Sequence, residues 1–527
     1  FNGTIAENIP HLGDRHLNEP MANNQQGAMW KQLLFRSARD NLSLQAQIRE
    51  MLVGAILDGH LRPNEAVPSS RLLAEHLSVG RITVVLAYQQ LADEGYLFSK
   101  ERKGHFVSAD IVGGRFKKMT EFGSVDPNGV VVNWGARFCQ HPSLQRSISK
   151  PANWQSYAYP FLYGQFDESL FPTSAWRECC LKALSVIDIR AWAPDQISRD
   201  DDSLVHQICT RVLPRRGVWA TPDELIVTVG AQHALYMIAD LLISSGTRVA
   251  IEDPGYPDAR NIFSSRTDAL TPVAIDSHGL VVGEHLRNFD YIYTTPSHQC
   301  PTGVTMPLSR REQLLRLANE SNVVIIEDDF ESENNFEGHP IPALKSLDRN
   351  NRVIYVGSLS KSMAPGLRIG YIVAAPELIA ELRALRRLMI RHPSTFIQRS
   401  LSLFISLGHN DAQLKRLGEA QKERSALVLQ AMAEFAPQCS IAPLTGGGSC
   451  WVKLPAGVLA QDLAEVALDK GVLIETGEVF FHKLNASDNY IRLGFQSIQV
   501  GVIQAGIKAL ASAIDEVQFG LSKQHNN

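Results

Sequence analysis

The strongest constraint on the fold is a set of short, almost uninterrupted runs of apolar residues that recur along the chain. The run Val323-Val324-Ile325-Ile326 is followed at once by three acids, Glu327-Asp328-Asp329. Strands that are apolar at every position are typical of a sheet covered on both faces. Helical stretches, for example residues 310–319 and 376–389, separate the runs, which predicts an α/β layer fold. The predicted strands are residues 225–229, 248–252, 291–295, 323–327, 352–356 and 369–373.

The first part of the chain has a different pattern, with three short helices and two short strands. Helical spacing of apolar residues ends at Asp58-Gly59, a helix C-terminal signal. Ser69 or Ser70 is a good N-cap for a second helix, and Ser78-Val79-Gly80 forms a tight turn before a third. This segment is predicted to be a winged helix-turn-helix. Its helices are predicted at residues 41–58, 69–77 and 81–94, and its strands at residues 96–98 and 105–107.

Polar residues at the start of the second and third helices suit DNA recognition. A recognition helix enters the major groove with its N-terminus, and arginine binds guanine edges or phosphates. The alternative is a small dimerisation module whose arginines are only solvated. Net charge does not distinguish DNA binding from dimerisation, because residues 30–110 contain ten Lys/Arg and nine Asp/Glu. The residues predicted to contact DNA are Ser70, Arg71, Arg81, Thr83, Lys103 and Gly104.

The order of motifs in this segment resembles the winged helix of GntR-type regulators. The segment contains Pro68-Ser69-Ser70-Arg71, Leu73-Ala74, Val79-Gly80-Arg81-Ile82-Thr83-Val84, and Leu91 followed by Glu94-Gly95-Tyr96-Leu97. Two positions depart from the family pattern, since Gly80 replaces the usual serine and Ile82 the usual asparagine. Ile82 has no polar group, so it favours apolar readout such as contact with a thymine methyl. The resemblance implies operator DNA as a partner.

A lysine with phosphate-type ligands follows the predicted strand at residues 352–356. Ser358-Leu359-Ser360-Lys361 supplies two hydroxyls, and Arg368 lies seven residues beyond the lysine, a set that suits a dianionic phosphate. Gly230-Ala231-Gln232 stands at a strand-to-helix turn, where free backbone N–H groups bind phosphate. The alternatives are coincidence for the lysine motif and an ordinary tight turn for the glycine motif.

Two further features match what pyridoxal phosphate requires, a carboxylate on the ring nitrogen and an aromatic plate over the ring, and a third suits a substrate carboxylate. One of Glu327, Asp328 and Asp329 would hold the ring nitrogen, although spacing does not say which, and a helix cap or surface pair is the alternative. Tyr256 follows a Pro-Gly turn and is either the plate or a packed turn residue. Arg492 lies opposite the apolar face of an alternating strand and either binds a carboxylate or faces solvent.

Together, these motifs resemble a fold-type I aminotransferase from about Trp154 to Ala513. Joined to the winged helix, they resemble the MocR-type subfamily of GntR regulators. Other matching landmarks are Phe171-Pro172, Trp176, Arg216-Gly217-Val218, Glu252-Asp253-Pro254-Gly255-Tyr256, Pro301-Thr302-Gly303 and Ile369-Gly370-Tyr371.

The resemblance implies a pyridoxal 5'-phosphate-dependent transcription regulator that senses an amino acid or related amine through aldimine exchange. Lys361 is then the Schiff-base lysine, Asp328 the partner of the ring nitrogen, and Tyr256 the stacking ring. Arg492 would take the effector carboxylate, and a homodimer is implied. The residues predicted to bind the cofactor are Lys361, Asp328, Tyr256, Gly230, Ala231, Gln232, Ser358, Ser360 and Arg368.

Two departures weaken the rival interpretation, a working aminotransferase with an appended domain. Aminotransferases commonly place an asparagine before Pro-Thr-Gly and a tyrosine after the ring-nitrogen aspartate. Here those positions are Cys300 and Phe330, so two donors to the cofactor's phenolic oxygen are absent. His298 or Gln299 is a possible substitute donor. We therefore expect sensing, with at most weak partial transamination.

Length and composition set the remaining expectations. A chain of 527 residues is too long for one hydrophobic core. We expect a leader at 1–28, the winged helix at 29–110, a linker at 111–150, and the aminotransferase-like domain with a smaller C-terminal subdomain at 151–520. The leader lacks the pattern of a secretion signal. Seven cysteines without metal-ligand spacing, and no long apolar run, predict a cytoplasmic protein without a metal site.

Overall fold

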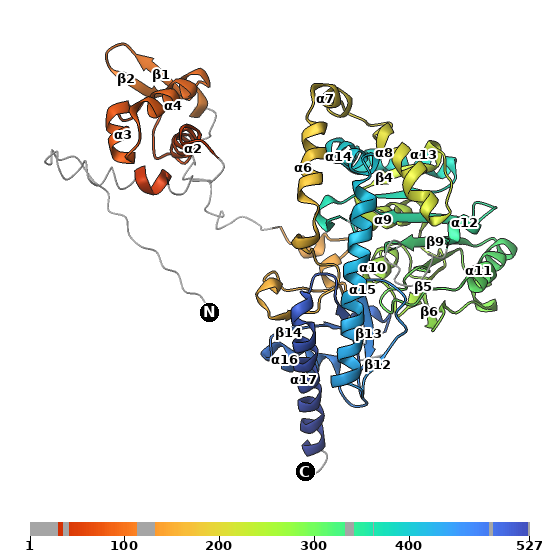
Figure 1. The fold of residues 1–527 in the computed structure, drawn as a ribbon. Helices are drawn as coiled ribbons and strands as arrows, with labels where there is room; N and C mark the ends of the chain where they lie inside the picture. The colour runs from red at the N-terminus through yellow and green to blue at the C-terminus, as the bar shows by residue number, and fades with distance from the viewer. Residues whose placement is uncertain are drawn as a thin grey trace. The chain divides into compact units, whose positions relative to one another are not determined.

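The computed structural model describes residues 30–34, 42–112, 132–331, 342–361, 363–483 and 489–524. The expected leader and residues 113–131 of the expected linker lie outside these ranges. The chain divides into two units, Phe1–Ala136 and Arg137–Asn527 (Figure 1). Within the described ranges, no helix combines the length and the apolar character that a membrane span needs.

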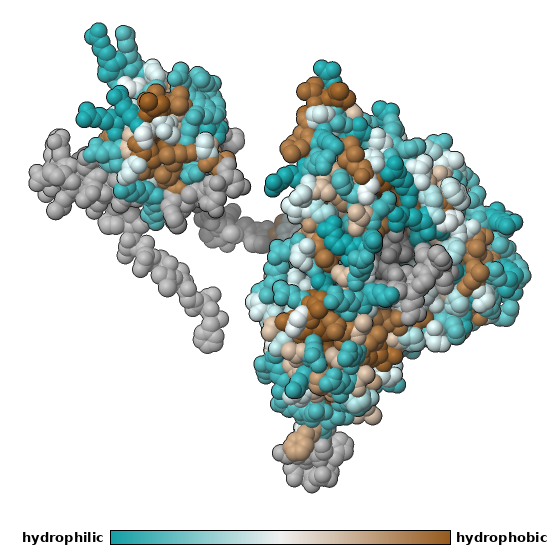
Figure 2. All heavy atoms as spheres, viewed as in Figure 1, coloured by the Kyte–Doolittle hydropathy of each residue, from teal (hydrophilic) through white to brown (hydrophobic). Residues whose placement is uncertain are grey.

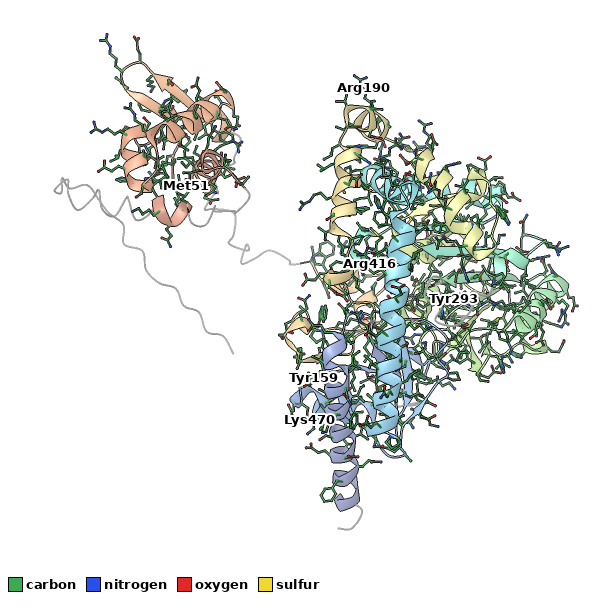
Figure 3. All side chains as sticks on the ribbon, viewed as in Figure 1. Met51, Tyr159, Arg190, Tyr293, Arg416 and Lys470 are labelled. Atoms are coloured by element: carbon green, nitrogen blue, oxygen red, sulfur yellow. The ribbon has the colours of Figure 1, made fainter. Side chains whose placement is uncertain are left out.

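The small unit is a winged helix-turn-helix, as predicted. The side chain of Ser69 caps the second helix by accepting a hydrogen bond from the Leu72 N–H, and Ser78 ends that helix in the left-handed conformation. Apolar side chains from all three helices form one core, into which Met51 points (Figure 3). The elements are α2 (Leu44–Leu57), α3 (Ser70–Leu77), α4 (Arg81–Asp93), the hairpin β1 (Leu97–Lys100) and β2 (Gly104–Val107), and α5 (Ala109–Val112).

The large unit is built on an eight-stranded sheet whose order is β4-β11-β10-β9-β8-β5-β6-β7. All six predicted strands are present, and β6 and β7 add an edge that the sequence analysis did not predict. The strands from β10 to β6 are parallel, whereas β11 is antiparallel to both of its neighbours. The strands are β4 (Leu225–Thr228), β5 (Val249–Asp253), β6 (Leu270–Asp276), β7 (Gly279–Leu280), β8 (Tyr291–Thr294), β9 (Val324–Asp329), β10 (Val353–Ser358) and β11 (Gly370–Val373).

Helices cover the sheet, which explains why its central strands are apolar at nearly every position. Strand side chains such as Ile326 and Ile372 pack with α9, α10 and α13 in one core. Side chains such as Tyr355 and Val373 pack with other helices in a second core. The helices of this part are α6 (Thr173–Ala183), α7 (Val186–Trp192), α8 (Asp202–Gln207), α9 (Gly230–Leu242), α10 (Pro257–Ser264), α11 (Leu308–Ser321), α12 (Leu344–Leu347), α13 (Pro376–Ile390) and α14 (Thr395–Ser406).

A smaller C-terminal subdomain has its own sheet, with the order β12-β13-β16-β15. The 27-residue helix α15 runs from the large sheet into this subdomain, where it packs with α17 around a third core (Figure 1). The elements are α15 (His409–Phe435), β12 (Ser440–Ile441), β13 (Ser449–Lys453), α16 (Ala460–Asp469), β14 (Val472–Leu473), which pairs with β3 (Tyr159–Pro160), β15 (Glu475–Thr476), the 3-10 helix η10 (Gly477–Phe480), β16 (Tyr490–Gly494) and α17 (Ile503–Gln524).

The segment before the first strand of the large unit packs against both of its parts. The guanidinium of Arg146 donates hydrogen bonds to the carbonyls of Phe481 and His482 at 3.0 and 2.7 Å. The carbonyl of Arg146 accepts a hydrogen bond from Asn261 of α10 at 2.8 Å. Residues 137–150, which the sequence analysis assigned to the linker, therefore belong structurally to the large unit.

Candidate cofactor site and DNA-binding surface

A cavity of about 290 Å³ lies at the carboxyl edge of the large sheet, with the small subdomain contributing one wall. The topology creates it, because β9 and β10 end at this edge and the antiparallel β11 begins there. Every residue predicted to bind the cofactor lines the cavity, and so does Arg492. The other lining residues are Ile148, Lys150, Tyr163, Gly164, Asp258, Cys300, Phe330 and Pro365.

Lys361 follows the end of β10, and its accessible surface faces this cavity and a smaller one beside it. Its Nζ donates a hydrogen bond to the hydroxyl of Tyr163 at 3.3 Å and lies 5.7 Å from the ring centre of Phe330. Burial lowers the pKa of Lys361, while the nearby carboxylate of Glu331 opposes that shift. A lowered pKa increases the fraction of uncharged amine, which is the nucleophilic form.

Three adjacent acids at the end of β9 have different environments. Glu327 accepts hydrogen bonds from the N–H groups of two residues at the start of α12. Asp329 accepts hydrogen bonds from Arg216 at 2.9 Å and from Tyr355 at 2.7 Å. Asp328 points to the opposite face of the strand and is the one that lines the cavity.

Asp328 has one satisfied and one unsatisfied oxygen. Its Oδ2 accepts a hydrogen bond from the hydroxyl of Tyr293 (labelled in Figure 3) at 2.9 Å. Its Oδ1 is buried and has no hydrogen-bond partner within the described part of the chain. Burial raises the pKa of Asp328 to about 7. A protonated ring nitrogen placed against Oδ1 would satisfy this oxygen and stabilise its charge.

At one end of the cavity, the start of α9 closely approaches Arg368. Gly230 begins α9 with a φ of +78°, and a Cβ there would lie 3.1 Å from the guanidinium of Arg368. No side chain caps this helix, so the first N–H groups are left for an anion. Arg368 also donates a hydrogen bond to the carbonyl of Val229 at 3.2 Å. The N–H groups at the start of α9 and the guanidinium of Arg368 thus form a cradle whose positive charge suits an anion.

The two serines differ in how much they can contribute to this cradle. Ser358 ends β10 and lines the cavity. Ser360 is buried, and its hydroxyl donates to the Ile369 carbonyl at 3.1 Å and accepts from the Ile369 N–H at 2.7 Å. Because its donor is already used, the Ser360 side chain mainly holds the loop that carries Lys361 and Arg368.

Tyr256 reaches the cavity from the start of α10. Its hydroxyl donates a hydrogen bond to Asp258 at 3.1 Å, and the same carboxylate oxygen accepts one from Gln232 at 3.3 Å. Asp258, which the sequence analysis did not identify, therefore connects the predicted ring plate to the first turn of α9.

Arg492 projects from β16 of the small subdomain and is only 2% exposed. Its Nε donates to Glu475 at 2.6 Å, and its guanidinium lies 4.3 and 4.6 Å from the ring centres of Tyr163 and Phe480. These contacts fix its plane, yet Nη2 is buried without a partner among the described residues. A guanidinium held in this way is prepared for a carboxylate.

The two departures from the aminotransferase pattern both face the cavity. Cys300 and Phe330 are lining residues, and burial raises the pKa of the Cys300 thiol to about 12, so it stays neutral. Neither suggested substitute lines the main cavity. Gln299 donates to the Pro254 carbonyl at 2.8 Å, and His298 lines a smaller cavity that shares Cys300 and Phe330 with the main one.

Besides Asp258, sequence reasoning missed four charged or aromatic residues that shape the site. Glu331 is buried and hydrogen-bonded to Tyr163, and it could have been suspected because it closely follows the three acids of β9. Glu475, Tyr163 and Lys150 stand in segments without a recognisable motif, and only long-range packing brings them together beside the cavity.

The predicted DNA contacts lie on the two helix starts and on the wing. Arg71 and Arg81 are exposed at the first turns of α3 and α4, Lys103 is exposed in the turn of the wing, and Gly104 is exposed at the start of β2. Ser70 and Thr83 are half-buried. The hydroxyl of Tyr88 donates to the Pro68 carbonyl at 2.7 Å and so connects α4 to the loop before α3.

The exposed face of α4 is apolar where a polar recognition face is common. Ile82 is 77% exposed, and Val85 and Leu86 are exposed beside it. Gly80 supplies no side-chain cap, so the first N–H groups of α4 are not occupied by a cap. Apolar contact with base methyl groups and backbone contact with phosphates are therefore available at the same helix end.

Comparison with known proteins gives both parts a family. Residues 44–107 match the family model "Bacterial regulatory proteins, gntR family", and residues 199–503 match "Aminotransferase class I and II". The HTH-type transcriptional regulator TauR of Rhodobacter capsulatus is 40% identical over 474 residues, which are 90% of this chain and 96% of that protein. The probable rhizopine catabolism regulatory protein MocR of Rhizobium meliloti is 28% identical over 481 residues, which are 90% of this chain and 94% of that one.

Among solved structures, the large unit is similar to the kynurenine aminotransferase of Pyrococcus horikoshii. The TM-score is 0.66 at 26% identity, and the match covers 73% of this chain and 98% of that enzyme. The predicted fold class, a winged helix joined to a fold-type I aminotransferase-like domain, is confirmed. The chain belongs to the MocR-type subfamily of GntR-family transcription regulators.

Proposed function

We propose that this regulator binds pyridoxal 5'-phosphate in the cavity and that an amine effector displaces Lys361 from it. The observation that carries the proposal is that Lys361, Asp328 and the Gly230–Arg368 cradle all line one cavity. When bound, the cofactor supplies an aldehyde carbon that either Lys361 or an effector amine can hold covalently. The protein supplies the binding, the orientation and the charges around it.

The described residues fit this group at each of its ends. The unpartnered Oδ1 of Asp328 suits a ring N–H, and the cradle suits a dianion. Tyr256 supplies an aromatic face. Lys361 has the lowered pKa that an attacking amine needs.

The effector class follows from the wall opposite the sheet. Arg492 offers an unpartnered Nη2 in a buried position, which favours an amine that also carries a carboxylate. An amino acid has both groups. Its carboxylate would engage Arg492, while its amine would take the place of the Lys361 Nζ.

Effector binding would change the structure through these same contacts. An effector can shift a regulator only by binding two conformations with different affinity. Release of Lys361 and occupation of Arg492, which belongs to the small subdomain, would favour closure of that subdomain over the cavity. That movement would alter how the DNA-binding unit engages its operator.

The test uses Lys361→Ala beside Lys422→Met, a change of an exposed lysine on α15. We expect wild type and Lys422→Met to show the visible absorbance of lysine-bound cofactor, and borohydride to fix the cofactor to Lys361. Lys361→Ala should lose both signals and still bind an operator selected from random-sequence DNA, but without any response to an effector amine. An unchanged spectrum or a normal effector response in Lys361→Ala would rule out the proposed switch.

We also propose that the regulator acts as a homodimer. Helices α6 and α7 expose apolar side chains at one end of the large unit, which Figure 2 shows as a hydrophobic area. Val186 and Ile187 are 67% and 80% exposed. Contiguous exposed apolar side chains of this kind are typical of interaction surfaces. Sedimentation analysis of wild type and Ile187→Asp would test this, since the variant should dissociate.

A second candidate function is transamination, because Lys361, Asp328 and Arg492 all face the cavity. The neutral thiol of Cys300 and the ring of Phe330 stand where aminotransferases carry hydrogen-bond donors, so we expect at most slow turnover. Rapid multiple turnover with a keto-acid acceptor would favour the enzyme function.

A further inference from the structure

Lys150 reaches the cavity wall from the segment that leads toward the DNA-binding unit. A Cβ on Gly164 would lie 3.5 Å from the Nζ of Lys361 and 3.9 Å from the Nζ of Lys150. The two ammonium groups therefore lie on the same side of Gly164, and both residues line the cavity. Neither the sequence motifs nor the family comparison assigns a role to Lys150.

Glu475 is shared between Lys150 and Arg492. The Oε1 atom of Glu475 lies 3.3 Å from the Nζ of Lys150, and its Oε2 accepts the Arg492 Nε at 2.6 Å. Lys150 also donates to the carbonyl of Tyr163. Two cations thus share one carboxylate in a largely buried corner. Glu331, the other buried acid of this cluster, interacts with Lys361 and Arg492. The three cationic side chains therefore face two acids, and the excess positive charge is costly unless an anion joins it.

The backbone around Lys150 is held firmly, so its position is part of a built site. Arg146 donates to the carbonyls of Phe481 and His482, which follow the same 475–480 stretch that carries Glu475. Ile148, which lies between Arg146 and Lys150 in the sequence, also lines the cavity.

We propose that Lys150 and Arg492 together form an anion subsite that takes the carboxylate of the effector. The inference rests on the proposed function and deepens it, because it adds a specificity-determining residue to the effector site. It also means that the end of the segment leading to the DNA-binding unit contacts the effector directly.

The test uses acetate, a carboxylate without an amine, on the cofactor-loaded full chain. Acetate in the subsite would stabilise positive charge at Lys361, which faces Glu331, Arg492, Lys150 and Cys300. The measurement is the pKa read from the visible absorbance of lysine-bound cofactor, with acetate exchanged against chloride at constant ionic strength. Wild type should show a saturable rise of this pKa as acetate is added.

Lys150→Met should start from a higher pKa than wild type, because one neighbouring cation is removed. Its dissociation constant for acetate should rise about tenfold or more, as expected for loss of a charged hydrogen bond. Lys150→Arg should restore most of the acetate affinity. Lys422→Met, on exposed surface, should match wild type in both measurements.

A purely structural role for Lys150 predicts a different result. Acetate affinity within about twofold of wild type in Lys150→Met would overturn the subsite, and so would a wild-type protein whose pKa does not respond to acetate. Absence of the visible band in wild type would instead contradict the proposed function itself. The two failures are therefore distinguishable.

Discussion

Replacing Asp328 by asparagine should stabilise the cofactor-free protein while weakening cofactor binding. Burial raises the pKa of Asp328 from 3.8 to about 7, because the charged carboxylate has lost its water and gained only the Tyr293 hydroxyl. The folded state therefore holds a proton that the unfolded state releases. The unfolding free energy is therefore highest, as far as Asp328 is concerned, below about pH 4, and it falls as the pH rises from about 4 to about 7. Asparagine keeps an acceptor for Tyr293 and carries no charge.

The free-energy cost of ionising Asp328 in the folded state follows from its pKa shift of about three units, at about 1.36 kcal/mol for each unit. At pH 8.5, the charged carboxylate costs about 4 kcal/mol of unfolding free energy, and at pH 5.5 about 2 kcal/mol. Asp328→Asn should recover these amounts in urea unfolding of the cofactor-free protein. In the loaded protein, the ring nitrogen loses its counter-charge, so the dissociation constant for pyridoxal phosphate should rise by at least tenfold.

Asp329→Asn is the matched control, one residue further along the strand. Arg216 and hydrogen bonds hold the pKa of Asp329 below its usual range, so this carboxylate stabilises the fold above its unfolded pKa. Its replacement removes the ion-pair partner of the buried Arg216, which keeps only neutral hydrogen-bond partners such as Ser297, and should destabilise by about 3–5 kcal/mol. If Asp328→Asn does not stabilise the cofactor-free protein, or if its effect is the same at pH 5.5 and 8.5, the reasoning about this carboxylate is refuted.

Gly230→Ala should weaken pyridoxal phosphate binding strongly, because Gly230 has a positive φ and a Cβ would enter the cradle; equilibrium dialysis measures this. Arg71→Ala and Arg81→Ala should each cost about 1–3 kcal/mol of operator affinity in gel-shift titrations, and the affinity of the wild type should fall steeply with salt. Equal binding by both variants would contradict the assigned DNA surface. Cys300→Asn combined with Phe330→Tyr should speed transamination, measured as keto-acid formation, and no gain would mean that other groups limit turnover.

Local pattern was enough to predict most of the architecture. Apolar runs and helical spacing depend on neighbours in the chain, so the winged helix and the six strands were predicted to within a few residues. Order along the sequence also indicated the cavity, because residues after parallel strands meet at one edge of the sheet. Strand order therefore grouped Lys361, Tyr256 and the Gly230 turn at one edge, and the resemblance to fold-type I aminotransferases implied their roles.

Only the tertiary structure determined those features of the site that depend on contacts between residues far apart in the sequence. Strand alternation places Asp328 on one face of β9 and Glu327 and Asp329 on the other. Only the tertiary structure shows that α12 and Arg216 pack against Glu327 and Asp329, while Asp328 faces the cavity. Lys150 and Glu475 come from segments without a motif, and they meet because the small subdomain folds back beside the start of the large unit. Sequence spacing carries no information about such pairs, since their proximity is created by the fold as a whole.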